Sequence, residues 1–175
     1  MMILAAGPLE LTRPLHLLRL VCFALAFSLG AGLAGTARAG ELAVGDAVPA
    51  LAAKDQFDQP FKFTPGLHYL LLGFDMGASK QANLKLADLG AGWLEQRGAV
   101  FMLDIHTMPG IARFFALPKM RKYPQRIILA DDAKMLEPFP RQPERITVLV
   151  LKPDGKIQSV RYWNPSADPL APILQ

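Results

Sequence analysis

The sequence contains a single cysteine, Cys22, and it lies inside an apolar run near the N-terminus. A chain that loses this run has no thiol, which excludes disulfides, thiolate nucleophiles and cysteine-ligated metal centres. Dinucleotide-binding and phosphate-binding loops are also absent, because no G-x-G-x-x-G or Walker sequence follows an expected strand. We therefore expect neither thiol chemistry nor a bound cofactor.

Residues 1–39 are typical of a signal peptide. Two arginines precede the apolar run, and small residues lead to an A-x-A cleavage sequence that ends at Ala39. The alternative is a retained anchoring helix, but the uninterrupted apolar run is short for the ~20 residues that a span needs. We predict cleavage after this segment, a periplasmic or secreted product without a stable membrane span, and one domain over residues 40–175.

Charge gives little support for a nucleic-acid partner. The whole chain has 19 basic and 15 acidic residues. Residues 1–39 hold three of the basic and one of the acidic residues, so 16 and 14 remain after cleavage. Binding to phosphate backbones requires a concentrated positive surface, which such a balance does not predict. We expect no nucleic acid among the partners.

Apolar runs and turn residues predict the strands. The apolar run over residues 67–74 is nearly continuous, which is typical of a strand buried on both faces. Three phenylalanines that alternate with polar residues around Asp58-Gln59-Pro60 predict a short hairpin at a sheet edge. A P-D-G turn near the C-terminus predicts a second hairpin. The longer strands are expected over residues 67–74, 99–105, 126–132, 146–151 and 157–163.

The hydrophobic period changes to that of a helix after the first of these strands. Ser79 is the expected N-cap of that helix. A second helix is expected from Ile111 to about Ala116, with an interruption at Pro118. Strand, helix and strand in this order predict a right-handed parallel crossover. The residues expected to cover the sheet from the first helical segment are Leu84, Leu86, Ala87, Leu89, Trp93 and Leu94.

Three stretches resemble the thioredoxin-like superfamily, in particular its secreted, peroxiredoxin-like and TlpA-like members. They are "VGDAVPALAAKDQFDQPFKF", the strand-turn-helix over residues 69–89, and "RITVLVLKPDGKI". "MPGIARFFALPKMRKYPQRIILAD" is more closely similar to the small periplasmic YtfJ-like family. The resemblance covers residues 42–163. It implies an α/β fold of the thioredoxin-like type, a three-layer sandwich with a mixed central sheet and a C-terminal β-hairpin.

The resemblance also locates the positions where redox members keep their signature residues. Carried over residue by residue, the two cysteine positions fall on Ser79 and Ala82, and the cis-proline position falls on Ile146, just before Thr147. A serine hydroxyl neither forms disulfides nor cycles through sulfenic acid. The resemblance thus implies a redox-inactive member that binds a protein partner or a small anionic ligand and acts as a binding or adaptor protein rather than an enzyme.

Polar residues are expected to gather where the parallel strands end. Ligand sites in open α/β sheets favour this carboxyl edge. The start of the first helix carries free N–H donors and the charge of Lys80, so it could attract an anion. An equally simple interpretation is that these residues only cap a helix and end strands. The candidate set at this edge is Asp75, Ser79, Lys80, Ala82, Asp104, His106, Ile146 and Thr147.

Two chemical alternatives use the same edge. Ser79, Asp104 and His106 are the residue types of a hydrolytic triad, although no nucleophile-elbow motif is present. His106 and Met108 pair an imidazole with a thioether, ligands that suit Cu(I). The alternative to a binding protein is therefore a copper carrier or a non-redox enzyme.

A basic cluster surrounds Tyr123. Its members are Lys119, Arg121, Lys122 and Arg126. Such clusters are usually solvated faces. The functional alternative is a docking surface for an acidic partner or for anionic lipid headgroups.

Overall fold

The computed structural model describes residues 40–175. The signal-peptide prediction and Cys22 fall outside the described residues. Ala39–Gln175 forms one compact unit. This unit contains a complete sheet and both core clusters, so we expect it to fold without the preceding segment. None of the helices in this part of the chain is long and apolar enough to cross a membrane.

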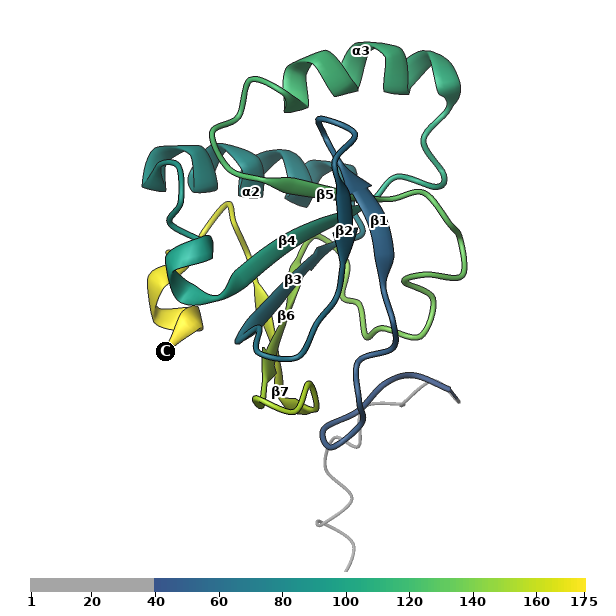
Figure 1. Ribbon diagram of the computed structural model, residues 1–175. Coiled ribbons are helices and arrows are strands. Elements are labelled where there is room, and N and C mark those ends of the chain that lie inside the picture. Colours follow the sequence, from purple (N-terminus) through teal and green to yellow (C-terminus); the bar gives the residue numbers. More distant parts are fainter. Residues whose placement is uncertain (1–39) are drawn as a thin grey trace, which may run out of the picture. The chain divides into compact units, whose positions relative to one another are not determined.

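Seven strands form one mixed sheet in the order β2-β1-β5-β4-β3-β6-β7 (Figure 1). β3 runs parallel to β4, and β4 runs parallel to β5, whereas the other pairs are antiparallel. The predicted parallel crossover, edge hairpin and C-terminal hairpin are all confirmed. The strands are β1 (Ala52–Asp55), β2 (Pro60–Lys62), β3 (Tyr69–Gly73), β4 (Ala99–Asp104), β5 (Ile127–Ala130), β6 (Ile146–Leu151) and β7 (Ile157–Trp163).

The helices differ from the predicted ones at their ends. α2 covers Met76–Leu89 and α3 covers Gly110–Met120, with short 3-10 helices η1 (Glu95–Arg97) and η2 (Ala171–Leu174). The predicted interruption of α3 at Pro118 is wrong. Proline costs a helix one backbone hydrogen bond, but Pro118 lies in the last turn, which the Arg121 N–H closes onto the Leu117 carbonyl at 3.0 Å.

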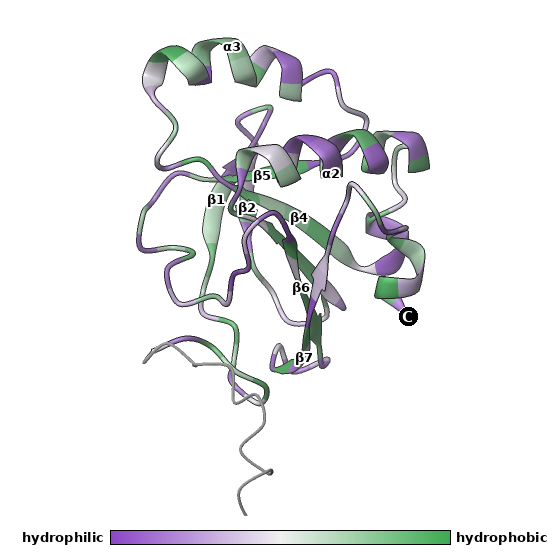
Figure 2. Cartoon of the chain, turned by 180° about the vertical axis from the view of Figure 1, so that it is seen from behind, coloured by the Kyte–Doolittle hydropathy of each residue, from purple (hydrophilic) through white to green (hydrophobic). Residues whose placement is uncertain are grey.

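The sheet is buried on both faces. One core cluster lies between the sheet and α2, which crosses one side of the strands (Figure 2). The other face is covered by the N-terminal segment at Val48 and Leu51 and by the connection at Leu136 and Phe139. The predicted α/β class with a mixed sheet is thus confirmed, and the layer on the second face consists of irregular chain.

α2 turns mainly small residues toward the sheet, and the predicted apolar face is confirmed only in part, at Leu86 and Leu94. Leu84 and Leu89 are 45% and 39% exposed. A glycine at the end of β3 explains this, because a Cβ on Gly73 would lie 2.5 Å from the Ser79 Oγ and 2.7 Å from a Leu103 methyl carbon. At its start the helix approaches the sheet too closely for large side chains, whereas Leu86 is buried further along the helix. The buried residues of α2 are Ala78, Ser79, Ala82, Asn83 and Leu86.

A buried glutamine extends the pairing of β1 with β5. The Gln56 amide donates to the Gln125 carbonyl at 2.9 Å, and its oxygen accepts from the Ile127 N–H at 2.8 Å. The Gln125 amide in turn donates to the Asn83 side chain of α2 at 3.0 Å. This network connects the edge hairpin and α2 to the centre of the sheet.

Replacing Gly73 by alanine tests the close approach of α2. The new methyl group would overlap Ser79 and Leu103, so we expect Gly73→Ala to lower the free energy of unfolding by about 1–3 kcal/mol. Urea unfolding of the chain from Gly40 measures the change. Gly110→Ala is the matched control, because its Cβ would have no atom within 4 Å and should leave stability unchanged or slightly raised. Equal unfolding midpoints for Gly73→Ala and the wild type would contradict the packing.

Candidate functional site

Asp75, and not Ser79, caps α2. Its backbone is extended, with φ −107° and ψ 134°, and its side chain accepts a hydrogen bond from the Ala78 N–H at 2.8 Å. Aspartate is among the strongest N-caps, because its carboxylate satisfies a free N–H and interacts favourably with the helix dipole. The carboxylate of Asp75 therefore already occupies part of the helix end that was expected to attract an anion.

The strand-to-helix turn between β3 and α2 buries two of the candidate positions. Ser79 is 8% exposed beside Gly73, and Ala82 is fully buried. Met76, the first residue of the helix, is 69% exposed. Exposure and a helix N-terminus both favour a reactive thiol, so a C-x-x-C frame on Met76 and Ser79 is an alternative to the frame on Ser79 and Ala82 that the resemblance implies.

Cysteine scanning separates the two frames. The chain from Gly40 contains no cysteine, so each variant reports a single thiol. We expect the thiol of Met76→Cys to react with a disulfide reagent at least about a hundredfold faster than that of Ala82→Cys, because exposure and the helix N-terminus favour the thiolate. Ser79→Cys should lie between them. Stopped-flow absorbance measures the rates, and a fast Ala82→Cys would show that the implied frame is right.

Asp104 and His106 do meet at the end of β4. The His106 Nδ1 and the Asp104 Oδ1 are paired, and the His106 N–H donates to the same oxygen at 3.2 Å. The pair occupies one ring nitrogen and orients the imidazole. Among residues 40–175 no hydrogen bond joins Ser79 to His106, and the buried Ser79 faces Gly73. The residues of the proposed hydrolytic triad therefore do not form a triad arrangement.

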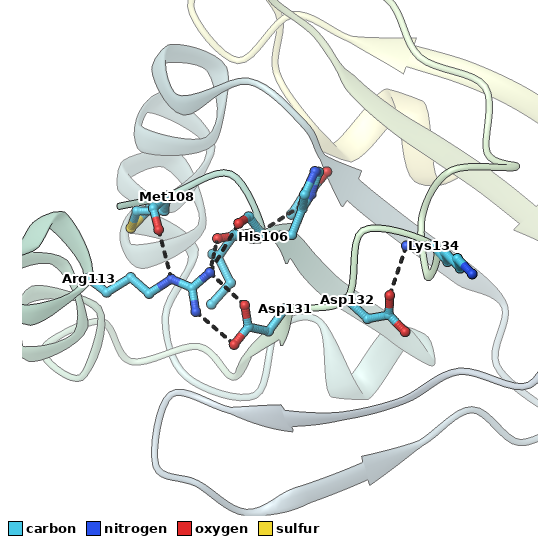
Figure 3. A network of polar contacts seen from close by, with 8 residues as sticks. His106, Met108, Arg113, Asp131, Asp132 and Lys134 are labelled. Atoms are coloured by element: carbon cyan, nitrogen blue, oxygen red, sulfur yellow. Dashed lines mark hydrogen bonds and ion pairs between the residues drawn. The ribbon is translucent and has the colours of Figure 1, made fainter. Parts of the chain in front are cut away.

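Arg113 holds the loop that carries His106 (Figure 3). Its guanidinium donates to the carbonyls of Met108 at 3.0 Å, Ile105 at 2.8 Å and His106 at 3.2 Å, and it pairs with Asp131 at 2.6 Å. An arginine fork suits such multiple acceptors. Arg113 was not among the predicted site residues. Its only mark in the sequence is that it is a charged residue within an apolar helical segment.

The remaining edge positions divide into buried and solvated ones. Ile146 and Thr147 are fully buried, and the Thr147 hydroxyl donates to the Pro140 carbonyl at 2.7 Å. Neither side chain is exposed for contact with a ligand. The residues that the structure describes include no cis peptide bond, the feature that the resemblance associates with position 146. Lys80 is exposed. The eight candidates thus share one edge of the fold without lining one cleft.

The His106 and Met108 pair does not form a convergent metal site. In Figure 3 the imidazole of His106 and the side chain of Met108 lie well apart. Met108 packs against the core cluster beneath α2. Within residues 40–175 no group of three His, Cys, Asp or Glu side chains could hold a metal ion.

The basic cluster separates into two kinds of residue. Arg121 donates to the Gln56 carbonyl at 2.7 Å and pairs with Asp58, and Arg126 pairs with Asp55 at 2.9 Å. Both arginines therefore hold the edge hairpin. The two lysines of the cluster, Lys119 and Lys122, are exposed, and their side chains make no hydrogen bond or ion pair with the described residues.

The Asp55 carboxylate makes stability depend on pH. Burial raises its pKa, but the N–H groups of Gln59 and Phe57 and the Arg126 guanidinium outweigh this effect and hold the pKa below its usual 3.8. A lowered pKa stabilises the fold above pH 3.8, and this contribution is lost as the pH falls through the folded-state value.

Asp55→Asn tests this linkage. We expect the wild type to be the more stable protein at neutral pH, because the variant lacks the charge that Arg126 and the backbone donors stabilise. The difference should shrink below pH 3.8 as the wild-type carboxylate is protonated. Thermal unfolding across the acidic range measures it, and a difference that stays constant would refute the assignment.

An open groove of about 700 Å³ lies between α3 and the β1–β2 hairpin. Its α3 wall includes Arg113, Leu117 and Arg121, and Ile105 and Asp131 come from the ends of β4 and β5. Sequence reasoning placed a cleft among the polar residues at the carboxyl edge, whereas this hollow extends from that edge toward the hairpin. The lining residues of the groove come from segments about half the domain apart in sequence, so no local sequence pattern could indicate the groove.

No protein-family model matches the sequence, and no curated protein matches it. Solved structures do match. A protein named as thiol:disulfide interchange protein DsbE from Chlorobium tepidum has a TM-score of 0.52 and 13% identity, over 72% of this chain and 90% of that chain. The thioredoxin domain of a thiol-disulfide oxidoreductase from Bacteroides vulgatus has a TM-score of 0.50 and 14% identity, over 77% of this chain and 100% of that chain. At such identities the likeness concerns the backbone, and the chain therefore has a thioredoxin-like fold.

Proposed function

We propose that this chain is an exported thioredoxin-fold protein without redox cysteines that binds a protein partner in the periplasm, as a member of the YtfJ-like family. The observation that carries the proposal is the groove between α3 and the β1–β2 hairpin. Its volume of about 700 Å³ lies in the range of known ligand sites. The sequence prediction of a signal peptide over residues 1–39 supports the location.

The residues at the former redox site support binding rather than catalysis. Ser79 and Ala82 are buried, and Met76, which is exposed, has a thioether that forms no disulfide. His106 is held by Asp104, and its loop is held by Arg113. These contacts stabilise the edge of the sheet and leave no nucleophile beside a base.

The charges in the groove indicate the chemistry of the partner. Lys54 and Lys62 line it and are exposed, and their side chains make no hydrogen bond or ion pair with the described residues. Three carboxylates of the lining are already paired with arginines, namely Asp55, Asp58 and Asp131. The fourth, Asp132, accepts only the backbone N–H of Lys134 and follows β5, so the unpaired side-chain charges on the hairpin strands are those of the two lysines. Apolar atoms form much of the surface around Leu117 and Leu129. The occupant is a peptide segment that combines apolar and acidic side chains.

Selection from a display library of random peptides tests this function, with the chain from Gly40 as bait. We expect enrichment of sequences in which apolar residues flank Asp or Glu. Binding of the enriched peptide to Lys54→Glu/Lys62→Glu should be at least about tenfold weaker, because two attractive charges become repulsive.

The matched control is Lys85→Glu/Lys152→Glu, which reverses two exposed lysines outside the groove. It should bind the peptide as the wild type does. Peptides without acidic residues, or equal loss in both double variants, would argue against the groove. Binding of small dicarboxylates with the affinity of the peptide would instead identify a small anionic ligand.

A further inference from the structure

α3 exposes the side chains that a helix normally buries. Ile111, Phe114 and Phe115 are 75%, 74% and 62% exposed, and no residue of α3 is fully buried. An amphipathic helix that packs on a sheet turns its apolar stripe toward the core. The two phenylalanine rings instead contact each other edge to face at 5.4 Å on the outer side. This outer stripe has no partner among the described residues.

The charge around this stripe has a single sign. α3 contains no acidic residue. Lys119 and Lys122 are exposed at its C-terminal end, and their side chains make no hydrogen bond or ion pair with the described residues. Arg113 and Arg121 lie on the groove side and are already paired. The free cations therefore accompany the apolar side chains on the outer face.

We propose that this outer face of α3, comprising Ile111, Phe114, Phe115, Lys119 and Lys122, docks on the surface of an anionic phospholipid bilayer. The apolar side chains enter the boundary between headgroups and acyl chains, and the ammonium groups pair with lipid phosphates. An interfacial helix of this kind lies in the plane of the membrane and need not span it. The protein would bind membranes peripherally.

The shape and size of the patch favour a bilayer over a folded protein partner. α3 lies at the periphery of the described unit in both views, with hydrophobic segments along it (Figures 1 and 2). The two rings and one isoleucine offer a few hundred Å² of apolar surface. A stable protein interface buries about 800 Å² on each partner. A lipid surface requires no matching concave shape, and cationic side chains suit its charge.

This site is separate from the groove of the proposed function. The groove uses the inner side of α3, through Arg113, Leu117 and Arg121. Docking through the outer side leaves the groove open, so peptide binding and membrane binding can be tested independently.

Vesicle flotation with the chain from Gly40 tests the proposal. We expect the protein to float with vesicles of phosphatidylcholine containing about one third phosphatidylglycerol, and to bind pure phosphatidylcholine at least about tenfold more weakly. Phe114→Ser/Phe115→Ser should lose binding to both kinds of vesicle, because it removes the inserted surface. Lys119→Glu/Lys122→Glu should lose at least about fivefold per lysine on the anionic vesicles alone.

The matched control is Val44→Ser/Lys152→Glu. It removes an exposed apolar residue and a lysine near the β6–β7 turn, outside α3, and should bind vesicles as the wild type does. Circular dichroism verifies that every variant is folded. No flotation of the wild type overturns the proposal, as does equal binding of all variants. Concentration-dependent dimers that Phe114→Ser/Phe115→Ser disperses, without vesicle binding, would assign the patch to a second copy of the chain.

Discussion

The close approach of α2 to the end of β3 is the constraint on which the rest of the molecule depends. With no room for a Cβ at Gly73, the first turns of the helix can present only small side chains to the sheet. Ser79 and Ala82 are buried for this reason, and Asp75 caps the helix at the surface. The turn between β3 and α2 therefore serves packing at Ser79 and Ala82, and Met76 is the residue of this helix start whose side chain is exposed.

Arginines organise the region that this packing leaves free for binding. Arg113 closes the loop after β4, and Arg121 and Arg126 hold the edge hairpin, each by joining backbone carbonyls to a carboxylate. The guanidinium group suits this role because its planar fork satisfies several acceptors at once. Four lysines of this region are exposed, two in the groove and two on the outer side of α3. Here the arginines serve structure and the lysines remain available, which places positive charge on both sides of one helix.

The strands could be predicted from the sequence because burial in a sheet leaves an almost continuous apolar run. β6 and β7 begin and end at the predicted residues, and the P-D-G turn between them required no tertiary information. The helices could not be predicted as well. The apolar period suggested that Leu84 and Leu89 face the sheet, but the narrow space above Gly73 selected Ala78 and Ala82 instead. In α3 the apolar residues Ile111, Phe114 and Phe115 stay exposed, although an amphipathic helix on a sheet normally buries such a stripe.

The sequence by itself determined the fold class, the order of the elements and the absence of thiols from residues 40–175, because periodicity, turn residues and composition are local properties. It also placed Asp104 and His106 at one strand end, since their spacing is two residues. Only the tertiary structure decided that Ser79 is buried, that Thr147 bonds the Pro140 carbonyl, and that a groove separates α3 from the hairpin. These features depend on contacts between segments far apart in the chain. Whether an apolar or charged side chain is available for binding is settled by what packs against it, and no local pattern contains that information.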